Sequence, residues 1–515
     1  MSRSEENHNA DVRDLARFGH TQELRRALGV YSSFAVAFSY ISPSTGIFTL
    51  YFLGLGLAGP AFFWSWPIVV IGQLIVGLNF AEVSAHFPVA GSVYQWTKYL
   101  SNPTYSWFTG WIYLFAGVLT VSAVVATVPL AFIPFLQGIG LNIPNTLDAQ
   151  RNVAIIVLIS TTLLSVFGVK LVALINNTGV VFEILGMVVF ALVMLIFYHH
   201  QSADVVFNGH QLTAGGANGI GTFMAAMFMS LFVIYGFDTA STLAEETKNP
   251  RREAPRAVIA SIIGAAVIGA IFLFATIIAI PGDVDKFVAG TAAGTISPPV
   301  AIIQADFPGW AANLYYLVVS AAVYVCCLAI QTATIRLAFG MARDGKLPLG
   351  RVYNKVSSSL HTPVGTCIVI GVVAGIPFLY YAGAGLIAIS ATGMIYISYL
   401  LGNVAILKAR LAGWPKEATA FKLGSWGTIV NLVALVWGGS MIINFLWPRS
   451  VASCSICNPP LSALPNINLG SSLGNIPIFE ATLGVILIVG AIYYFIAQRN
   501  AAPTAAIKSA AEVGA

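Results

Sequence analysis

Charged side chains are scarce in this chain. Asp, Glu, Lys and Arg make up only 9% of the 515 residues, whereas hydrophobic residues make up 57%, and the mean hydropathy is +0.82. Soluble globular domains contain about 25% charged residues, so the composition excludes a soluble fold and indicates an integral membrane protein. The formal net charge of +5 gives no support for nucleic-acid binding, and we expect no such partner.

Cysteine is also scarce, and the five cysteines do not form the pattern of a disulfide framework. Cys326, Cys327 and Cys367 lie in or beside apolar runs, where we expect them to pack as small hydrophobic residues. Cys454 and Cys457 form a C-x-x-C in an expected outer loop, and their spacing permits a disulfide in an oxidising compartment. No second pair completes a zinc site. We therefore expect neither a metal nor a cofactor.

The sequence lacks the constellations that an intramembrane enzyme needs. It contains no H-E-x-x-H, no paired interfacial carboxylates and no Ser/His/Asp grouping. We also expect the first apolar run to stay in the mature protein, because the polar residues 1–27 and the full-length run after them do not have the pattern of a cleavable signal peptide. We expect a protein that is not an enzyme.

Long apolar runs are what the sequence has in abundance. A run of about 20 residues crosses a hydrocarbon core of about 30 Å, and the chain divides into a tail at 1–28, a transmembrane domain at 29–498 and a tail at 499–515. The sequence predicts an all-α protein with about twelve transmembrane helices, at 29–54, 60–84, 106–136, 152–169, 173–198, 221–244, 256–281, 311–336, 363–382, 384–407, 425–447 and 477–497.

The distribution of basic residues predicts the orientation. If the N-terminus is cytoplasmic, these twelve spans leave only Arg151, Lys286 and Arg449 of the 25 basic residues on the outer side. Cytoplasmic loops carry an excess of Lys and Arg. We expect both termini in the cytoplasm and a location in the cell membrane.

Two of the predicted spans are interrupted near their middle. The first contains Ser42-Pro43-Ser44-Thr45-Gly46, and the sixth contains Gly236 and Asp238. Proline removes a helical N–H and glycine tolerates unusual dihedral angles, although such residues also kink membrane helices for packing alone. Non-helical backbone at membrane depth is tolerated where it is buried in protein or lines a cavity.

The spacing of the two interruptions predicts an inverted repeat. They lie five spans apart, at equivalent positions of repeats at about 29–198 and 221–410, with extra helices at about 425–497. An odd number of spans per repeat gives the two repeats opposite orientations, as in many secondary transporters.

Few ionisable residues lie at membrane depth, and each one indicates function. Glu183, in the fifth span, has no Lys or Arg in that span and is our candidate for proton coupling, the alternative being a hydrogen-bonded structural acid. Asp238 can either cap the inner half-helix or bind a substrate amine. Glu245 and Glu246, near basic loops, are interpreted as ion-pair residues of the inner side.

A broken helix offers both ends of a zwitterion a binding partner. A half-helix N-terminus suits a carboxylate, and exposed carbonyls suit an ammonium. The expected substrate is therefore an amino acid or a small amine. Thr332 and Thr334, in the eighth span, are candidates for a sodium site, although threonines there also bond to their own helix.

Four stretches resemble the amino acid, polyamine and organocation (APC) transporter superfamily, and they occur in that family's order. They are Ser44-Thr-Gly-Ile-Phe48, Phe87-Pro-Val-Ala-Gly-Ser-Val-Tyr94, the segment from Tyr235-Gly-Phe-Asp238 through Glu245-Glu-Thr-Lys-Asn-Pro-Arg-Arg252, and Met341-Ala-Arg-Asp-Gly-Lys-Leu-Pro348. The resemblance implies a leucine-transporter-like fold of five plus five helices in which helices 1 and 6 are broken.

The resemblance also implies where the substrate binds. Its carboxylate would lie at the first break and its amino group at the second, with two aromatic residues as a gate. Many relatives have a glycine-rich first-helix loop, and this chain has Ser-Pro-Ser in its place. This pattern is similar to that of the branch of 4-aminobutyrate, choline and polyamine permeases. The implied substrate-binding residues are Ser42, Ser44, Thr45, Gly46, Phe232, Tyr235, Gly236 and Asp238.

These features predict a secondary active transporter of amino acids or related small amines that works by alternating access and is coupled to protons. The expected partners are the substrate, a proton and membrane lipid. An amine or amino acid exchanger, and a substrate sensor on the same scaffold, remain as alternatives, and the oligomeric state is left open.

Overall fold

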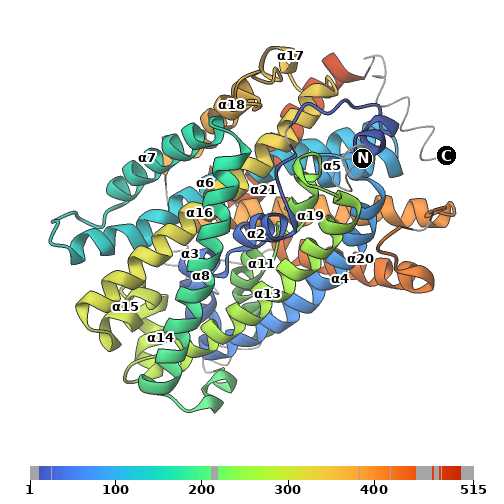
Figure 1. Cartoon of the computed structure of the whole chain (residues 1–515). Helices are drawn as coiled ribbons and strands as arrows, with labels where there is room; N and C mark the ends of the chain where they lie inside the picture. Colours follow the sequence, from blue (N-terminus) through green and yellow to red (C-terminus); the bar gives the residue numbers. More distant parts are fainter. Residues whose placement is uncertain are drawn as a thin grey trace.

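The computed structural model describes residues 11–24, 26–209, 219–381, 383–417, 419–447, 467–468, 475–476 and 478–499. Figure 1 shows a bundle of helices. The described residues contain one pair of strands, in which β1 (Ile467–Asn468) is antiparallel to β2 (Asn475–Ile476). The C-x-x-C at Cys454 and Cys457 lies outside the described residues, whereas Cys326, Cys327 and Cys367 are buried free thiols, as expected.

The first half of the bundle contains two helices separated by the first break, followed by four long helices. Short elements connect them. In chain order, the elements are α2 (Val30–Ile41), α3 (Pro43–Ala58), η1 (Gly59–Trp64), α4 (Ser65–His86), α5 (Ser92–Leu100), α6 (Pro103–Gly138), α7 (Leu147–Val166), α8 (Val169–Phe197) and η2 (Ala203–Phe207).

The second half again begins with a broken helix. Its elements are α10 (Gly219–Ala226), α11 (Phe228–Val233), α12 (Thr239–Thr242), η4 (Ala244–Glu246), α13 (Pro250–Ile278), α14 (Val284–Ala292), α15 (Pro298–Asp306), α16 (Gly309–Arg343), α17 (Gly350–Tyr353), α18 (Val364–Gly375), η5 (Ile376–Tyr380) and α19 (Ala384–Leu411). After these come η6 (Gly424–Trp426), α20 (Gly427–Leu446), α21 (Ile478–Tyr493) and the π-helical turn η9 (Tyr494–Gln498).

Nine helical segments of the described residues are long and apolar enough to cross a membrane. One of them, Val30–His86, is 57 residues long and covers the first two predicted spans, while Gly219–Val233 and Val364–Tyr380, in the sixth and ninth predicted spans, are shorter apolar helices. The chain is therefore a multi-pass membrane protein, and its described residues are almost entirely helical apart from the short β1–β2 pair. The arrangement of twelve helices in two repeats stays a prediction.

The helix α8 shows how the bundle separates lipid from core. Phe182 and Leu185 are 58% and 55% exposed, whereas Glu183 is 1% exposed. The inner face of α8 packs against α2, α13 and α16, and Figure 1 shows α8 running across α2. Because apolar side chains face outward and the one carboxylate faces inward, α8 has the polarity expected of a helix at the lipid boundary.

Candidate functional site

The first break is a single residue. Ser42 has left-handed dihedral angles (φ 35°, ψ 86°) between α2 and α3, and its N–H donates to the Phe38 carbonyl 2.8 Å away, which closes α2. Pro43 then starts α3, because proline fits the first turn of a helix, where no N–H is needed. The predicted interruption over Ser42–Gly46 is thus narrower than expected, since the helix resumes at Pro43.

The Glu183 carboxylate binds directly at this break. The Ser42 and Ser44 hydroxyls donate to Glu183 Oε1 over 2.7 and 2.6 Å, and Ser42 Oγ lies 2.7 Å from the Thr45 hydroxyl. The Ser44 backbone N–H also interacts with this carboxylate. Sequence reasoning placed Glu183 and the serines in separate roles, and the structure brings them together at the N-terminus of α3, where the helix dipole favours an anion.

The second break is longer and is built around Gly236. Residues 234–238 are non-helical, Gly236 has a φ of 84°, and its N–H donates to the Tyr399 hydroxyl over 2.9 Å. This position favours glycine for two reasons. Its backbone is left-handed, and a Cβ there would lie 1.8 Å from the Tyr40 ring. The second break is therefore required by packing as well as by backbone conformation.

The Asp238 carboxylate accepts hydrogen bonds from three hydroxyl groups. Ser92 donates over 2.5 Å, and Tyr113 and Tyr399 also donate to it. Although Asp238 occupies the N-cap position of α12, its side chain makes no capping hydrogen bond. The interpretation of this side chain as a helix cap is therefore wrong, because hydroxyls from α5, α6 and α19 reach it instead.

The two breaks lie close together, and α3 contacts α11 beside them. A Cβ on Gly46 would lie 2.1 Å from Val233 Cγ2, so α3 and α11 approach as closely as glycine permits. Tyr235, a predicted gate residue, has its ring 6.1 Å from the Tyr40 ring and 5.9 Å from that of Phe232. The predicted substrate residues from helices 1 and 6 thus form one buried contact region.

Neither predicted sodium ligand forms a hydrogen bond with a residue of the first break in the part of the chain that the structure describes. Thr334 Oγ1 donates to the Ile330 carbonyl of its own helix over 2.9 Å, and Thr332 Oγ1 has no hydrogen-bond partner among the described residues. Cys326 of α16 reaches α2, where its thiol donates to the Tyr40 carbonyl over 3.6 Å. Thr334 thus makes the bond to its own helix that was the alternative to a sodium site.

Most other buried carboxylates are paired with a cation. Glu245 and Glu246 form the ion pairs expected of them, at 2.8 Å from Arg343 and Arg336 respectively. Further buried pairs join Lys98 to Asp344 over 2.8 Å and Arg410 to Glu82. No cation forms an ion pair with Glu183 or Asp238 among the described residues. Glu183 and Asp238 thus differ from the paired carboxylates, because in the described part of the chain hydroxyl groups and not a cation contact their charge.

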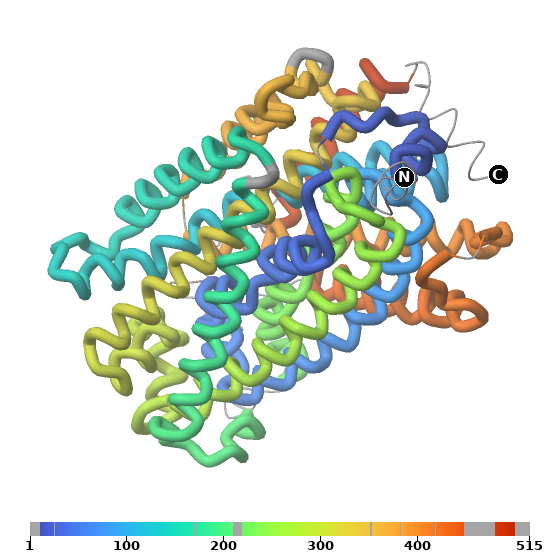
Figure 2. The backbone as a smooth tube through the Cα atoms, in the orientation of Figure 1, coloured from blue at the N-terminus to red at the C-terminus, as the bar shows by residue number. Residues whose placement is uncertain are grey.

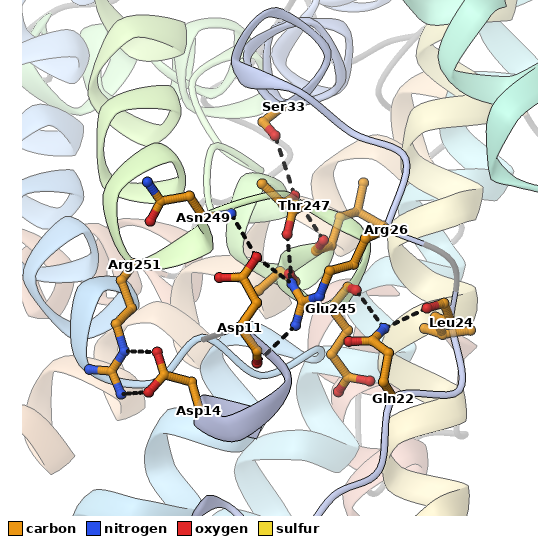
Figure 3. A network of polar contacts seen from close by, with 12 residues as sticks. Asp11, Asp14, Gln22, Leu24, Arg26, Ser33, Glu245, Thr247, Asn249 and Arg251 are labelled. Carbon is orange, nitrogen blue, oxygen red and sulfur yellow. Dashed lines mark hydrogen bonds and ion pairs between the residues drawn. The ribbon is translucent and has the colours of Figure 1, made fainter. Parts of the chain in front are cut away.

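The segment from η4 to the start of α13 is held by an N-terminal strap, which we define as residues 11–24 and 26–28. The Leu28 N–H donates to the Glu246 carbonyl over 2.9 Å, and the Lys248 N–H donates to the Leu28 carbonyl over 3.0 Å. Arg26 donates to the Thr247 carbonyl over 2.7 Å, and Gln22 to that of Glu245 over 3.0 Å. Figure 3 shows the hydrogen bonds of Arg26 and Gln22 in this network, and Figure 2 shows the strap (dark blue) beside the start of α13.

The strap also carries a buried histidine. Burial, followed by the charges of Arg343 and Lys98, lowers the pKa of His20 to about 4. Burial alone would raise the pKa of Glu245, but Arg343 beside it holds that pKa below its ordinary value. The strap thus covers a cluster of charges at the end of helix 6, a role that sequence analysis missed when it treated residues 1–28 as a tail.

Some of the site residues that sequence analysis missed carried a sequence signal, and others carried none. Ser92 and Arg343 belong to motifs that the sequence already contained, and the structure gives each a partner within a third motif, in Asp238 and Glu245. Tyr113 and Tyr399 had no such signal, because aromatic residues are common in apolar helices.

Comparison with known proteins gives a consistent result. The model of the family described as "Amino acid permease" matches residues 28–460. The chain is 27% identical to the "Amino-acid permease BAT1 homolog" of Oryza sativa subsp. japonica, over 85% of this chain and 87% of the relative. It is 28% identical to the "Branched-chain amino acid permease BcaP" of Bacillus subtilis (strain 168), over 67% and 73% respectively. The chain belongs to the amino acid permease family of the APC superfamily.

Proposed function

We propose that this protein is a secondary active transporter that carries an amino acid or a related small amine together with a proton, by alternating access around the two breaks. The observation that carries the proposal is the contact of Glu183 with Ser42 and Ser44, because it joins an uncompensated buried acid to the start of a half-helix. Membership of the permease family supports the substrate class.

The geometry supports a direct way to couple proton and substrate. Glu183 occupies the donors at the N-terminus of α3 that suit a substrate carboxylate. Two carboxylates that share one site cannot both remain charged, so the arrival of the substrate raises the proton affinity of Glu183. Protonation then removes the negative charge, and the serine hydroxyls become free to bind the substrate.

The orientation and the coupling ion belong to the same proposal. We place the strap and both termini in the cytoplasm of a cell-membrane protein, in two five-helix repeats, because the basic residues gather on that side. A proton suits the site better than sodium, because the Thr334 hydroxyl is bonded within its own helix, whereas Glu183 lies directly at the first break, where it can take up a proton.

Uptake into proteoliposomes tests the proposal. Labelled α-amino acids, 4-aminobutyrate, choline and polyamines are supplied with an imposed pH gradient, an imposed sodium gradient or an internal counter-substrate. We expect saturable uptake of one substrate class, driven by an inward proton gradient. Uptake that needs only counter-substrate would identify an exchanger, and no transport of any compound would favour the sensor.

A further inference from the structure

We propose that a cavity beside the strap binds a phosphate ester, separately from the transport site. The cavity has a volume of about 630 Å³ and lies among the strap, the segment after α4, the end of α5, the start of α13, and the end of α19 with the loop that follows it. The lining residues that carry the proposal are Arg17, Phe87, Arg251, Lys408, Trp414 and Lys416.

The cavity has an excess of positive charge. Arg251 is 2.7 Å from Asp14 and is therefore neutralised, but no ion pair joins Arg17, Lys408 or Lys416 to a carboxylate among the described residues. Glu417 is the one carboxylate that lines the cavity. Three cations against one carboxylate leave a surplus of two charges, and a phosphate monoester carries about −1.5 to −2 at neutral pH.

A general excess of basic residues on one side of the membrane does not explain this cluster. Some basic residues elsewhere on that side, such as Arg336, Arg343 and Lys98, are each held by a buried carboxylate, and exposed ones such as Lys355 lie apart from this cavity. The positive-inside rule sets only the side on which a cation lies. It does not require unpaired cations from the strap and the end of α19 to line one cavity.

One wall of the cavity is aromatic. The Phe87 ring stacks on the Tyr99 ring at 5.2 Å and on the Trp414 ring at 6.4 Å. Such a wall accommodates an apolar or flat group beside the cations. The ligand class is therefore a phosphate attached to an apolar or aromatic moiety, which either a phospholipid headgroup region or a free nucleotide supplies.

The proposed ligand would join the strap to the rest of the bundle. Arg17 and Phe18 belong to the strap, whereas Lys408 and Lys416 belong to the end of α19 and the loop after it. A phosphate bound between these cations stabilises the strap in contact with the bundle. Binding is therefore expected to slow backbone hydrogen exchange in residues 11–24.

A binding experiment tests the proposal on the purified full-length protein in neutral detergent. The probes are dioctanoyl phosphatidic acid, ATP and inorganic phosphate, with dioctanoyl phosphatidylcholine as the zwitterionic control. The test variant is Arg17→Gln, Lys408→Gln and Lys416→Gln together, all at exposed, unpaired positions. The matched control is Lys355→Gln, an exposed lysine that does not line the cavity. Size-exclusion profiles and melting temperatures establish that both variants fold.

We expect the triple variant to bind about 100-fold more weakly, at about fivefold per cation, and the Lys355 variant to bind as the parent does. Binding of phosphatidic acid alone identifies a lipid headgroup, and binding of ATP identifies a soluble ligand. Equal binding by the parent and the triple variant, or no binding of any phosphate probe, would overturn the proposal. Substrate uptake is measured separately, so failure of this site and failure of the transport proposal are distinguishable.

Discussion

Replacing Gly46 with alanine is expected to impair transport by forcing the two broken helices apart. The new Cβ would lie 2.1 Å from Val233 Cγ2, whereas an ordinary contact of this kind is 3.4–4 Å, so the surfaces must separate by more than 1 Å. Val233 is β-branched and has little rotamer freedom in a helix. Overpacking of a buried contact costs about 1–3 kcal/mol, which corresponds to a 5- to 150-fold loss if the closed contact is part of the cycle.

A rescue variant makes this prediction specific. Val233→Ala removes Cγ2, so the Gly46→Ala, Val233→Ala double variant should recover much of the initial uptake rate that the single Gly46 variant loses. Gly439→Ala serves as the control, because nothing lies within 4 Å of a Cβ at that position. The reasoning is refuted if Gly46→Ala transports like the parent, or if Val233→Ala fails to improve it while both variants fold.

Two further predictions concern the strap and the ion pairs beneath it. Because the pKa of His20 is about 4 in the folded protein against 6.5 in the unfolded chain, the unfolded chain binds more protons between these values, and stability falls by up to about 3 kcal/mol as the pH falls through this window. His20→Gln should flatten the pH dependence of melting between pH 4 and 6.5, and an unchanged profile would contradict the assignment. Arg343→Gln leaves the Glu245 carboxylate buried without its cation and should destabilise the protein by about 3–5 kcal/mol. Adding Glu245→Gln should restore part of that loss, which differential scanning fluorimetry can measure.

Much of the architecture was readable from the sequence, because hydrocarbon imposes strong rules. The apolar runs fall on the helices of the structure, and Pro43 and Gly236 mark the two breaks, since a helix in lipid can lose its hydrogen bonds only where protein replaces them. Glu183 could be selected as a candidate for the same reason, because a carboxylate at membrane depth is energetically costly and therefore indicates a function.

The contacts of the site were not readable, because they depend on which helices meet. Nothing in the spacing of Tyr113 or Tyr399 indicates that both bind Asp238, and an N-cap position alone suggested a different role for that carboxylate. The strap was missed because its binding depends largely on backbone atoms, such as the Leu28 N–H, whose partners are not encoded by residue type.

The most direct test of the account is substrate uptake by Glu183→Gln in proteoliposomes, with and without an inward proton gradient, alongside counter-substrate exchange. Glutamine keeps the size and the hydrogen-bonding capacity of the side chain but cannot take up a proton. The account predicts that the parent is accelerated by the gradient, whereas Glu183→Gln still exchanges substrate and no longer responds to the gradient. A Glu183→Gln variant that responds to the gradient as strongly as the parent would contradict the central claim.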